Sequence, residues 1–337
     1  MRRGLSAGAV ISSLLVLASF ITPPVASAAQ TLAQVKAQVT QLEEEATTAA
    51  EGAQEAKVKL AELTRSLAGI QAEAEAQGKT VDAISKTLGT IAINQYMSGS
   101  ISQSMELLFS SDPTLYLSSA GVLEAITRRK STQLRRFQSA EQKLNATSLT
   151  VSDRLAQVKV QQKKFAAQSS LATAKLEQAQ AVLANLKKED RERLAKISED
   201  QENADQAASL KAAKNASAIS GRGGIALRFA LKQIGDRYVF GADGMTYWDC
   251  SGLTMRAFQA AGVSLPHSSA AQSRMGKSIP FNQKKPGDLL FYGRPVSHVS
   301  IYMGRTQMVH APRSGSRVKV VESLSMGPKQ LVAVRRF

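Results

Sequence analysis

The chain has 337 residues, a formal net charge of +16, three histidines and one cysteine. One cysteine excludes an intramolecular disulfide, and a four-ligand zinc site would consume every histidine and the cysteine, so we expect no metal and no other cofactor. The charge is concentrated in residues 221–337, which hold 17 Lys and Arg against 5 Asp and Glu. Such a field favours polyanions, and without a DNA- or RNA-recognition motif we expect carboxylate- or phosphate-rich polymers rather than nucleic acid.

Residues 1–28 have the pattern of a secretory signal. The basic start "MRR" precedes an apolar run, and Ala26, Ser27 and Ala28 supply the small residues that a signal peptidase reads. An uncleaved membrane anchor is the alternative, but a run of about seventeen residues diluted by Ser and Gly is marginal for a bilayer. We therefore expect cleavage after Ala28, an extracytoplasmic, wall-associated protein, and no permanent membrane insertion.

Residues 29–198 predict a long helical hairpin. Apolar residues recur every seven positions for some sixty residues, which is typical of a coiled coil. A second, looser arm follows, and between the arms the heptad is lost and a helix restarts at Asp112 and Pro113. We expect an antiparallel hairpin with a helical tip around residues 95–122. The first arm's seam comprises Leu32, Val35, Val39, Leu42, Ala46, Ala49, Ala53, Ala56, Leu60, Leu63, Leu67 and Ile70, and continues to Ile91.

Residues 199–222, rich in Ala, Ser and Gly towards their end, indicate a linker. Residues 223–337 then form a domain of ordinary size. Its two helical segments end near Gly235 and Gly262, and after "KKPGD" the period changes to that of strands. Helices followed by a run of antiparallel strands predict an α+β fold. The expected strands are "LLFYG", "HVSIYMG", "QMVHA", "RVKVVES" and "LVAVRRF".

The cysteine, Cys250, is expected at the N-terminus of a helix, where unpaired N–H groups and the helix dipole stabilise a thiolate. A cysteine nucleophile also needs a base held in one tautomer. If the chain reverses around Gly304, His298 and His310 are direct cross-strand neighbours, and one imidazole can orient the other. The pattern thus predicts an ionised, accessible thiol in a Cys-His-His row. The alternative is a buried inert cysteine with two half-buried sheet histidines.

The segments "YWDCSGL", "KPGDLLFY", "HVSIYMG" and "MVHAP", in this order, resemble the NlpC-type peptidoglycan endopeptidases over nearly all of residues 225–337. The resemblance implies a papain-like fold in which Cys250 is the nucleophile, His298 the base and His310 the orienting residue. It also implies that Tyr238, Asp249 and Ser251 line the site or hold the stem peptide. A third histidine, His267, stands where the family often has Arg, and we expect it at the surface or the substrate rim.

The N-terminal region is similar to the coiled-coil regulators of division-associated wall hydrolases. That resemblance implies that the hairpin tip binds the septal FtsE-FtsX complex and that the coiled coil restrains the enzyme. Three functions follow as hypotheses. The first is a thiol endopeptidase that cuts stem peptides between D-glutamate and diaminopimelate or lysine during daughter-cell separation. The second is a thiol N-acetylmuramoyl-L-alanine amidase, and the third a non-catalytic divisome scaffold.

Overall fold

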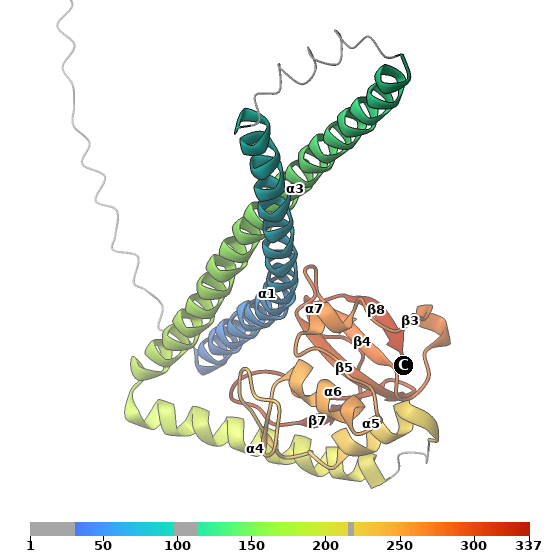
Figure 1. Cartoon of the computed structure of the whole chain (residues 1–337). Coiled ribbons are helices and arrows are strands. Elements are labelled where there is room, and N and C mark those ends of the chain that lie inside the picture. Colours follow the sequence, from blue (N-terminus) through green and yellow to red (C-terminus); the bar gives the residue numbers. More distant parts are fainter. Residues whose placement is uncertain (1–30, 98–112, 215–218) are drawn as a thin grey trace, which may run out of the picture.

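The computed structural model describes residues 31–97, 113–214 and 219–337. Two long helices, α1 (Leu32–Met97) and α3 (Pro113–Ala184), form a hairpin that extends from one side of a C-terminal domain (Figure 1). The expected signal segment, residues 1–28, and most of the expected tip fall outside the described residues. None of the described helices is long and apolar enough to cross a membrane.

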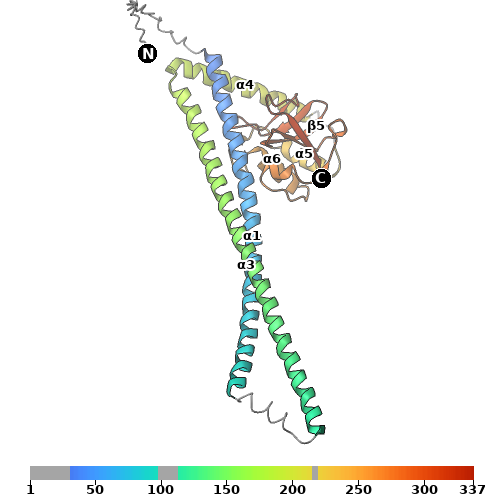
Figure 2. The ribbon, with the colours of Figure 1, turned by 90° about the horizontal axis from the view of Figure 1, so that it is seen from above.

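The two helices run antiparallel, as predicted. Lys175 of α3 pairs with Glu45 of α1 at 2.7 Å, whereas Lys143, earlier in α3, pairs with Glu73, later in α1, at 3.9 Å. In Figure 2 the two helices cross about midway and separate towards the far end of the hairpin. The predicted heptad seam faces the partner helix, because its residues are buried in the half of α1 nearest the domain. Those below 10% exposure are Val35, Val39, Ala46, Ala49, Ala53, Ala56, Leu63 and Leu67.

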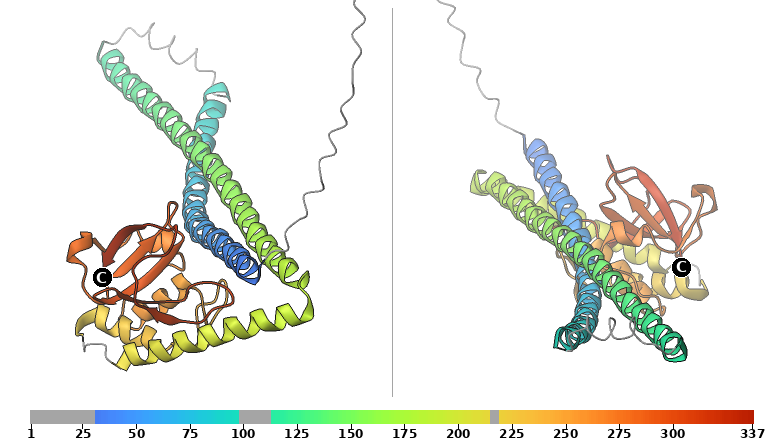
Figure 3. Two further views of the ribbon diagram at one scale, coloured as in Figure 1. Left: turned by 180° about the vertical axis from the view of Figure 1, so that it is seen from behind. Right: turned by 45° about the horizontal axis from the view of Figure 1, so that its top comes forward.

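The segment expected as a linker is largely helical, so the linker prediction is wrong. This helix, α4 (Lys188–Lys214), follows a short turn after α3 and lies along the domain (Figure 3). It covers the edge strand β7 (Lys319–Val321), which would otherwise present unpaired backbone groups to water. The Lys319 ammonium contacts a carboxylate oxygen of Glu202 and one of Asp205, each at 2.8 Å.

Ser209 of α4 also bonds directly to the backbone of β7. Its hydroxyl, fully buried, accepts a hydrogen bond from the Val320 N–H at 2.9 Å. The Ala- and Ser-rich composition that suggested a linker instead gives α4 the small side chains that allow this close approach. We conclude that α4 is part of the C-terminal domain rather than a tether to it.

Replacing Ser209 with alanine tests this conclusion. The substitution leaves the buried Val320 N–H without its acceptor, so the free energy of unfolding is expected to fall by about 1–2 kcal/mol. Thermal or urea unfolding of the full chain measures the change. Asn203→Ala, at an exposed position of the same helix, is the control and is expected to change stability by less than about 0.5 kcal/mol. Equal stability of the two variants would contradict an integral α4.

The domain is built on a six-stranded sheet of order β3-β8-β4-β5-β6-β7, in which every neighbouring pair is antiparallel. The five strands expected from the sequence are confirmed, and the two-residue β3 was not expected. Together with the helical hairpin this confirms the α+β fold class. The remaining strands are β3 (Lys277–Ser278), β4 (Leu289–Tyr292), β5 (His298–Gly304), β6 (Gln307–His310) and β8 (Leu331–Arg336).

Helices α5 (Gly221–Leu231) and α6 (Cys250–Gln259) pack on one face of this sheet. Between them and the sheet lies the main apolar core, which includes Leu227, Leu253 and Phe291. The opposite face carries a smaller cluster around Leu290 and Met308. Short elements complete the domain: the parallel pair β1 (Arg237–Tyr238) and β2 (Tyr247–Trp248), helix α7 (Ser269–Gln272) and the 3-10 turn η1 (Phe281–Gln283).

Candidate active site

The N-terminus of α6 places the cysteine. Asp249 caps the helix by accepting the Gly252 N–H at 2.6 Å, so Cys250 is the first helical residue. The loop before it packs so tightly that a Cβ on Gly252 would lie 2.3 Å from the Ala242 carbonyl oxygen, which explains the glycine. The Cys250 sulfur lies close to the backbone of Val299, the residue after His298 on β5. The thiol therefore lies beside the strand that carries the first histidine.

His298 and His310 are brought together, as predicted, but not as direct cross-strand neighbours. The register pairs Ile301 with Val309 and shifts by one residue at a bulge before Gly304. Continuing that register puts His310 opposite Ser300, so the two histidines are diagonal on one face of the sheet. Their rings still meet, with His298 Nε2 2.9 Å from His310 Nδ1. The turn, with Gly304 and Arg305 both at positive φ, causes the difference from the expected register.

Both imidazoles are buried, and burial lowers their pKa values. The pKa of His298 falls well below its ordinary value through burial and the neighbouring His310. Burial, reinforced by Lys319 and Arg313, lowers the pKa of His310 to about 3. Neutral rings suit a base, and His298 Nδ1, which has no hydrogen-bond partner among the described residues, is the nitrogen left to receive a proton.

Among the described residues the thiol donates its hydrogen bond to a carboxylate from α1 and not to either imidazole. Glu51 Oε1 lies 3.2 Å from the Cys250 sulfur and accepts the Ser251 hydroxyl at 2.5 Å. Glu51 Oε2 accepts the N–H of Ser269 at 2.8 Å and its hydroxyl at 2.7 Å. The Glu51 side chain, 2% exposed, thus ends in a cage of four donors with the thiol among them.

This carboxylate reverses the expected state of the thiol. Cys250 is only 1% exposed, and burial together with the charges of Glu51 and Asp249 raises its pKa well above the ordinary value. The prediction of an ionised, accessible thiol is therefore wrong for this structure. The hairpin supplies one cause, the Glu51 carboxylate, and the domain supplies another, the Asp249 carboxylate.

The expected peptide-binding residues all lie beside the thiol. Ser251 bonds Glu51, as described, and Tyr238 is 5% exposed, with a buried hydroxyl that has no hydrogen-bond partner among the described residues. Asp249 is 1% exposed and already accepts hydrogen bonds from the Gly252 and Gly241 N–H groups. In this structure Asp249 is thus a helix cap that holds the loop.

Of the two expected positions for His267, the surface or the substrate rim, the open surface is ruled out. Its Nε2 lies 2.8 Å from both carboxylate oxygens of Asp249, and its side chain is 16% exposed. Burial opposes protonation of His267, but the contact with Asp249 outweighs it and raises the pKa. A charged His267 would compensate the buried Asp249 carboxylate beside the thiol.

One face of α1, missed in the sequence, supplies the contacts across the cleft. Glu43, Thr47, Glu51 and Glu55 are spaced four residues apart, so they lie in a row along the helix. Glu43 pairs with Arg313 at 3.2 Å and Glu55 with Arg274 at 3.2 Å. The small residues around Glu51 allow the helix to approach closely. We call the three glutamates, Glu43, Glu51 and Glu55, the acidic row.

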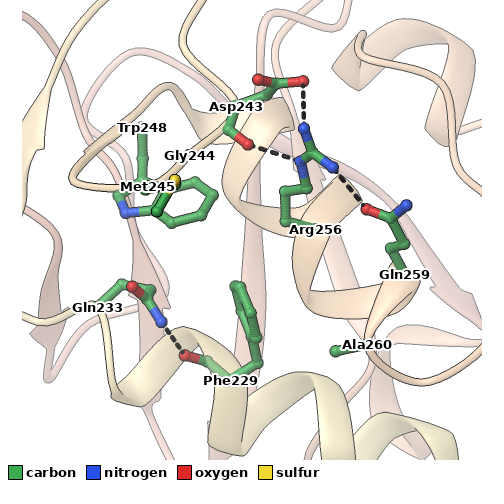
Figure 4. Close-up of a pocket in the computed structure, with 9 residues that line it drawn as sticks. All are labelled: Phe229, Gln233, Asp243, Gly244, Met245, Trp248, Arg256, Gln259 and Ala260. Carbon is green, nitrogen blue, oxygen red and sulfur yellow. Dashed lines mark hydrogen bonds and ion pairs between the residues drawn. The ribbon is translucent and has the colours of Figure 1, made fainter.

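A separate pocket lies behind the loop that precedes α6 (Figure 4). The aromatic rings of Phe229 and Trp248 form its apolar wall, and Arg256 bonds the carboxylate and carbonyl of Asp243. The lining contains neither the cysteine nor the paired histidines. The pocket is therefore not the catalytic cleft, which α1 fills.

Residues 235–336 match the family model described as the NlpC/P60 family. The match spans about 30% of the chain. The NlpC/P60 match covers the predicted nucleophile and both histidines but not the hairpin. The resemblance noted from the sequence is confirmed for this part of the chain.

Curated relatives match over the NlpC/P60 domain. A probable endopeptidase of Mycobacterium tuberculosis is 43% identical over 99 residues, which are 29% of this chain and 26% of the relative. The probable endopeptidase p60 of Listeria monocytogenes is 42% identical, over 32% of this chain and 22% of the relative. The peptidoglycan endopeptidase RipA of Mycobacterium tuberculosis is 36% identical, over 30% and 24%. The chain spans about a quarter of the length of these relatives.

Solved structures similar to the chain match over the same part. The peptidoglycan hydrolase RipB from Mycobacterium tuberculosis is 32% identical, covers 34% of this chain and 64% of its own, and has a TM-score of 0.30. NlpC2 from Trichomonas vaginalis is 26% identical, covers 35% and 48%, and has a TM-score of 0.33.

Proposed function

We propose that the chain is a secreted peptidoglycan hydrolase that cleaves stem peptides through Cys250. The observation that supports it is the position of this cysteine at a helix N-terminus, beside a hydrogen-bonded pair of histidines, within an NlpC/P60 domain. The basic surface of residues 221–337 would keep the domain near anionic wall polymer.

In this mechanism His298 Nδ1 accepts the thiol proton and the sulfur attacks the scissile carbonyl carbon. The N–H groups at the start of α6 stabilise the oxyanion, and His298 returns the proton to the leaving amine. Water then attacks the thioester and releases the acyl fragment with the thiol restored. His310 holds the His298 ring through the 2.9 Å contact. The bond proposed is that between D-glutamate and diaminopimelate or lysine.

We also propose that α1 keeps the enzyme closed until the hairpin is moved. The support is the Glu51 carboxylate on the Cys250 thiol, since no peptide can enter while α1 fills the cleft. A septal partner such as FtsE-FtsX acting at the hairpin tip would supply the displacement during daughter-cell separation. Secretion predicts a mature protein that begins at Ala29, which N-terminal sequencing checks.

Sacculi test the proposed reaction. The full chain opened by Glu51→Ala should release peptide fragments from purified sacculi, and the same chain with Cys250→Ala should release at least about a thousandfold less, because the nucleophile is gone. Mass spectrometry of the products separates endopeptidase cleavage from an amidase, which would free intact stem peptides. Equal release by both variants would reject the enzyme and leave the scaffold hypothesis.

A further inference from the structure

The two arginines bonded to the acidic row flank the catalytic cleft. Arg274 follows α7, whose first residue is Ser269 of the Glu51 cage. Arg313 lies three residues after His310, in the loop that leaves β6. Each arginine thus follows an element that also carries a residue of the site, Ser269 on α7 and His310 on β6. Their carboxylate partners in this structure, Glu55 and Glu43, come from α1 alone.

The spacing of the acidic row fixes where the arginines lie relative to the thiol. A helix rises 1.5 Å per residue, so Glu43 is about 12 Å from Glu51 along the axis on one side, and Glu55 about 6 Å on the other. An extended peptide that spans this total of about 18 Å has five or six residues. Arg313 and Arg274 therefore stand at the two ends of a peptide-sized cleft, with Cys250 between them.

When α1 leaves, both guanidinium groups lose their partners while the cleft becomes free. Arg274 is already 61% exposed and Arg313 26% exposed at the side chain, so both are within reach of a bound molecule. The planar guanidinium forms two-pronged bonds to carboxylates, and a cleft with a cation at each end selects an anionic strand.

We propose that Arg274 and Arg313 are specificity-determining residues that bind the carboxylates of an acidic peptide, and that the acidic row closes the cleft by standing in for that peptide. This inference rests on the proposed reaction of Cys250, and it assigns to the flanking arginines a role that α1 conceals in the closed protein. Each arginine then has two roles: it binds a glutamate of α1 in the closed protein, and it binds a carboxylate of the substrate in the open protein.

This dual use predicts effects of opposite sign for one substitution. With Glu51 in place, Arg313→Gln or Arg274→Gln removes a contact of α1, so iodoacetamide should alkylate Cys250 at least about twofold faster. In the chain opened by Glu51→Ala, the same substitutions should weaken binding of an acidic peptide. A purely structural role in docking α1 would produce the first effect without the second.

Poly-γ-D-glutamate is the probe for the second effect, with its fully amidated form as the neutral counterpart. It is expected to slow Cys250 alkylation in the Glu51→Ala chain at least about fivefold, and the amidated form should not. Adding Arg274→Gln or Arg313→Gln should remove more than half of this protection. Arg305→Gln, at the exposed turn at the far end of β5 from His298, is the control for loss of one positive charge. All rates are measured at one ionic strength, because salt screens exposed charges.

Absent protection, or protection that survives both arginine substitutions or is reduced equally by Arg305→Gln, would overturn the proposal. This readout needs no hydrolysis, so it separates the inference from the proposed function. Failure of the opened chain to cleave sacculi with intact protection would reject the reaction and keep the acidic-peptide site. Where sacculi are cleaved, the arginine substitutions should raise KM severalfold and leave kcat nearly unchanged.

Discussion

Replacing Glu51 with alanine in the full chain is expected to raise the rate of Cys250 alkylation by iodoacetamide at least about tenfold. Alanine keeps the helix intact, since it has the highest helix propensity, but it removes the only acceptor that the cage residues share. The N–H and hydroxyl of Ser269 are then left buried without an acceptor, whereas the Ser251 hydroxyl keeps Asp249 Oδ1 at 3.2 Å. Each such group costs about 1–3 kcal/mol unless water reaches it.

Water reaches these groups only when α1 moves away, so the substitution favours the open arrangement. Removal of the carboxylate also ends the cost of burying its charge, for which the described residues provide no cation in direct contact. The two Ser269 donors left unsatisfied cost about 2–6 kcal/mol, which opposes that gain. A net change of about 1.4 kcal/mol multiplies the open population tenfold. Glu51→Gln, which retains one acceptor oxygen, should fall between the wild type and Glu51→Ala.

The measurement is unambiguous because Cys250 is the only thiol in the chain. Glu62→Ala, at an exposed position later on α1, is the matched control and should alkylate at the wild-type rate. Hydrolysis of sacculi should rise in parallel with alkylation. If Glu51→Ala and the wild type react at the same rate, the carboxylate does not keep the cleft closed.

Elements with a strong local period could be predicted from the sequence, and elements fixed by tertiary contacts could not. The seam of α1 and the strands β4 to β8 follow from repeats of seven and two residues. Helix α4 looked like a linker because Ala and Ser carry little periodicity. What orders it are contacts to residues more than a hundred positions away, among them the Ser209 hydroxyl on the Val320 N–H and Lys319 between two carboxylates.

The candidate site shows the same division. Cys250 and the two histidines could be found because a helix start and two strands place them, although the turn at Gly304 shifted their register. Glu51 could not, because a glutamate on a helix face is usually solvated. The one sequence signal for Glu51 is the composition of the residues around it, "TTAAEGAQ", in which small uncharged residues replace the Lys and Glu of an exposed face. Only the fold shows that a domain some two hundred residues away covers that face.

Opening the cleft is also expected to move the pH dependence of Cys250 alkylation. Iodoacetamide reacts with the thiolate, so the rate rises as pH passes the thiol pKa. In the closed chain burial and the Glu51 charge hold that pKa well above its ordinary value, which places the rising limb at alkaline pH. In the Glu51→Ala chain water and the N-terminus of α6 favour the thiolate. A lower pKa puts the rising limb at lower pH.

The shift from the wild type to Glu51→Ala is expected to exceed about one pH unit, because desolvation and a neighbouring like charge each move a pKa by that order. His298 contributes in the open state: once hydrated, its pKa returns towards the ordinary value from which burial lowered it, and the imidazolium stabilises the thiolate. Adding His298→Ala to Glu51→Ala should therefore return the midpoint part of the way to alkaline pH. Identical profiles for the wild type and Glu51→Ala would show that the closed state does not control the charge of the thiol. If adding His298→Ala leaves the pH profile of the Glu51→Ala chain unchanged, His298 does not stabilise the Cys250 thiolate.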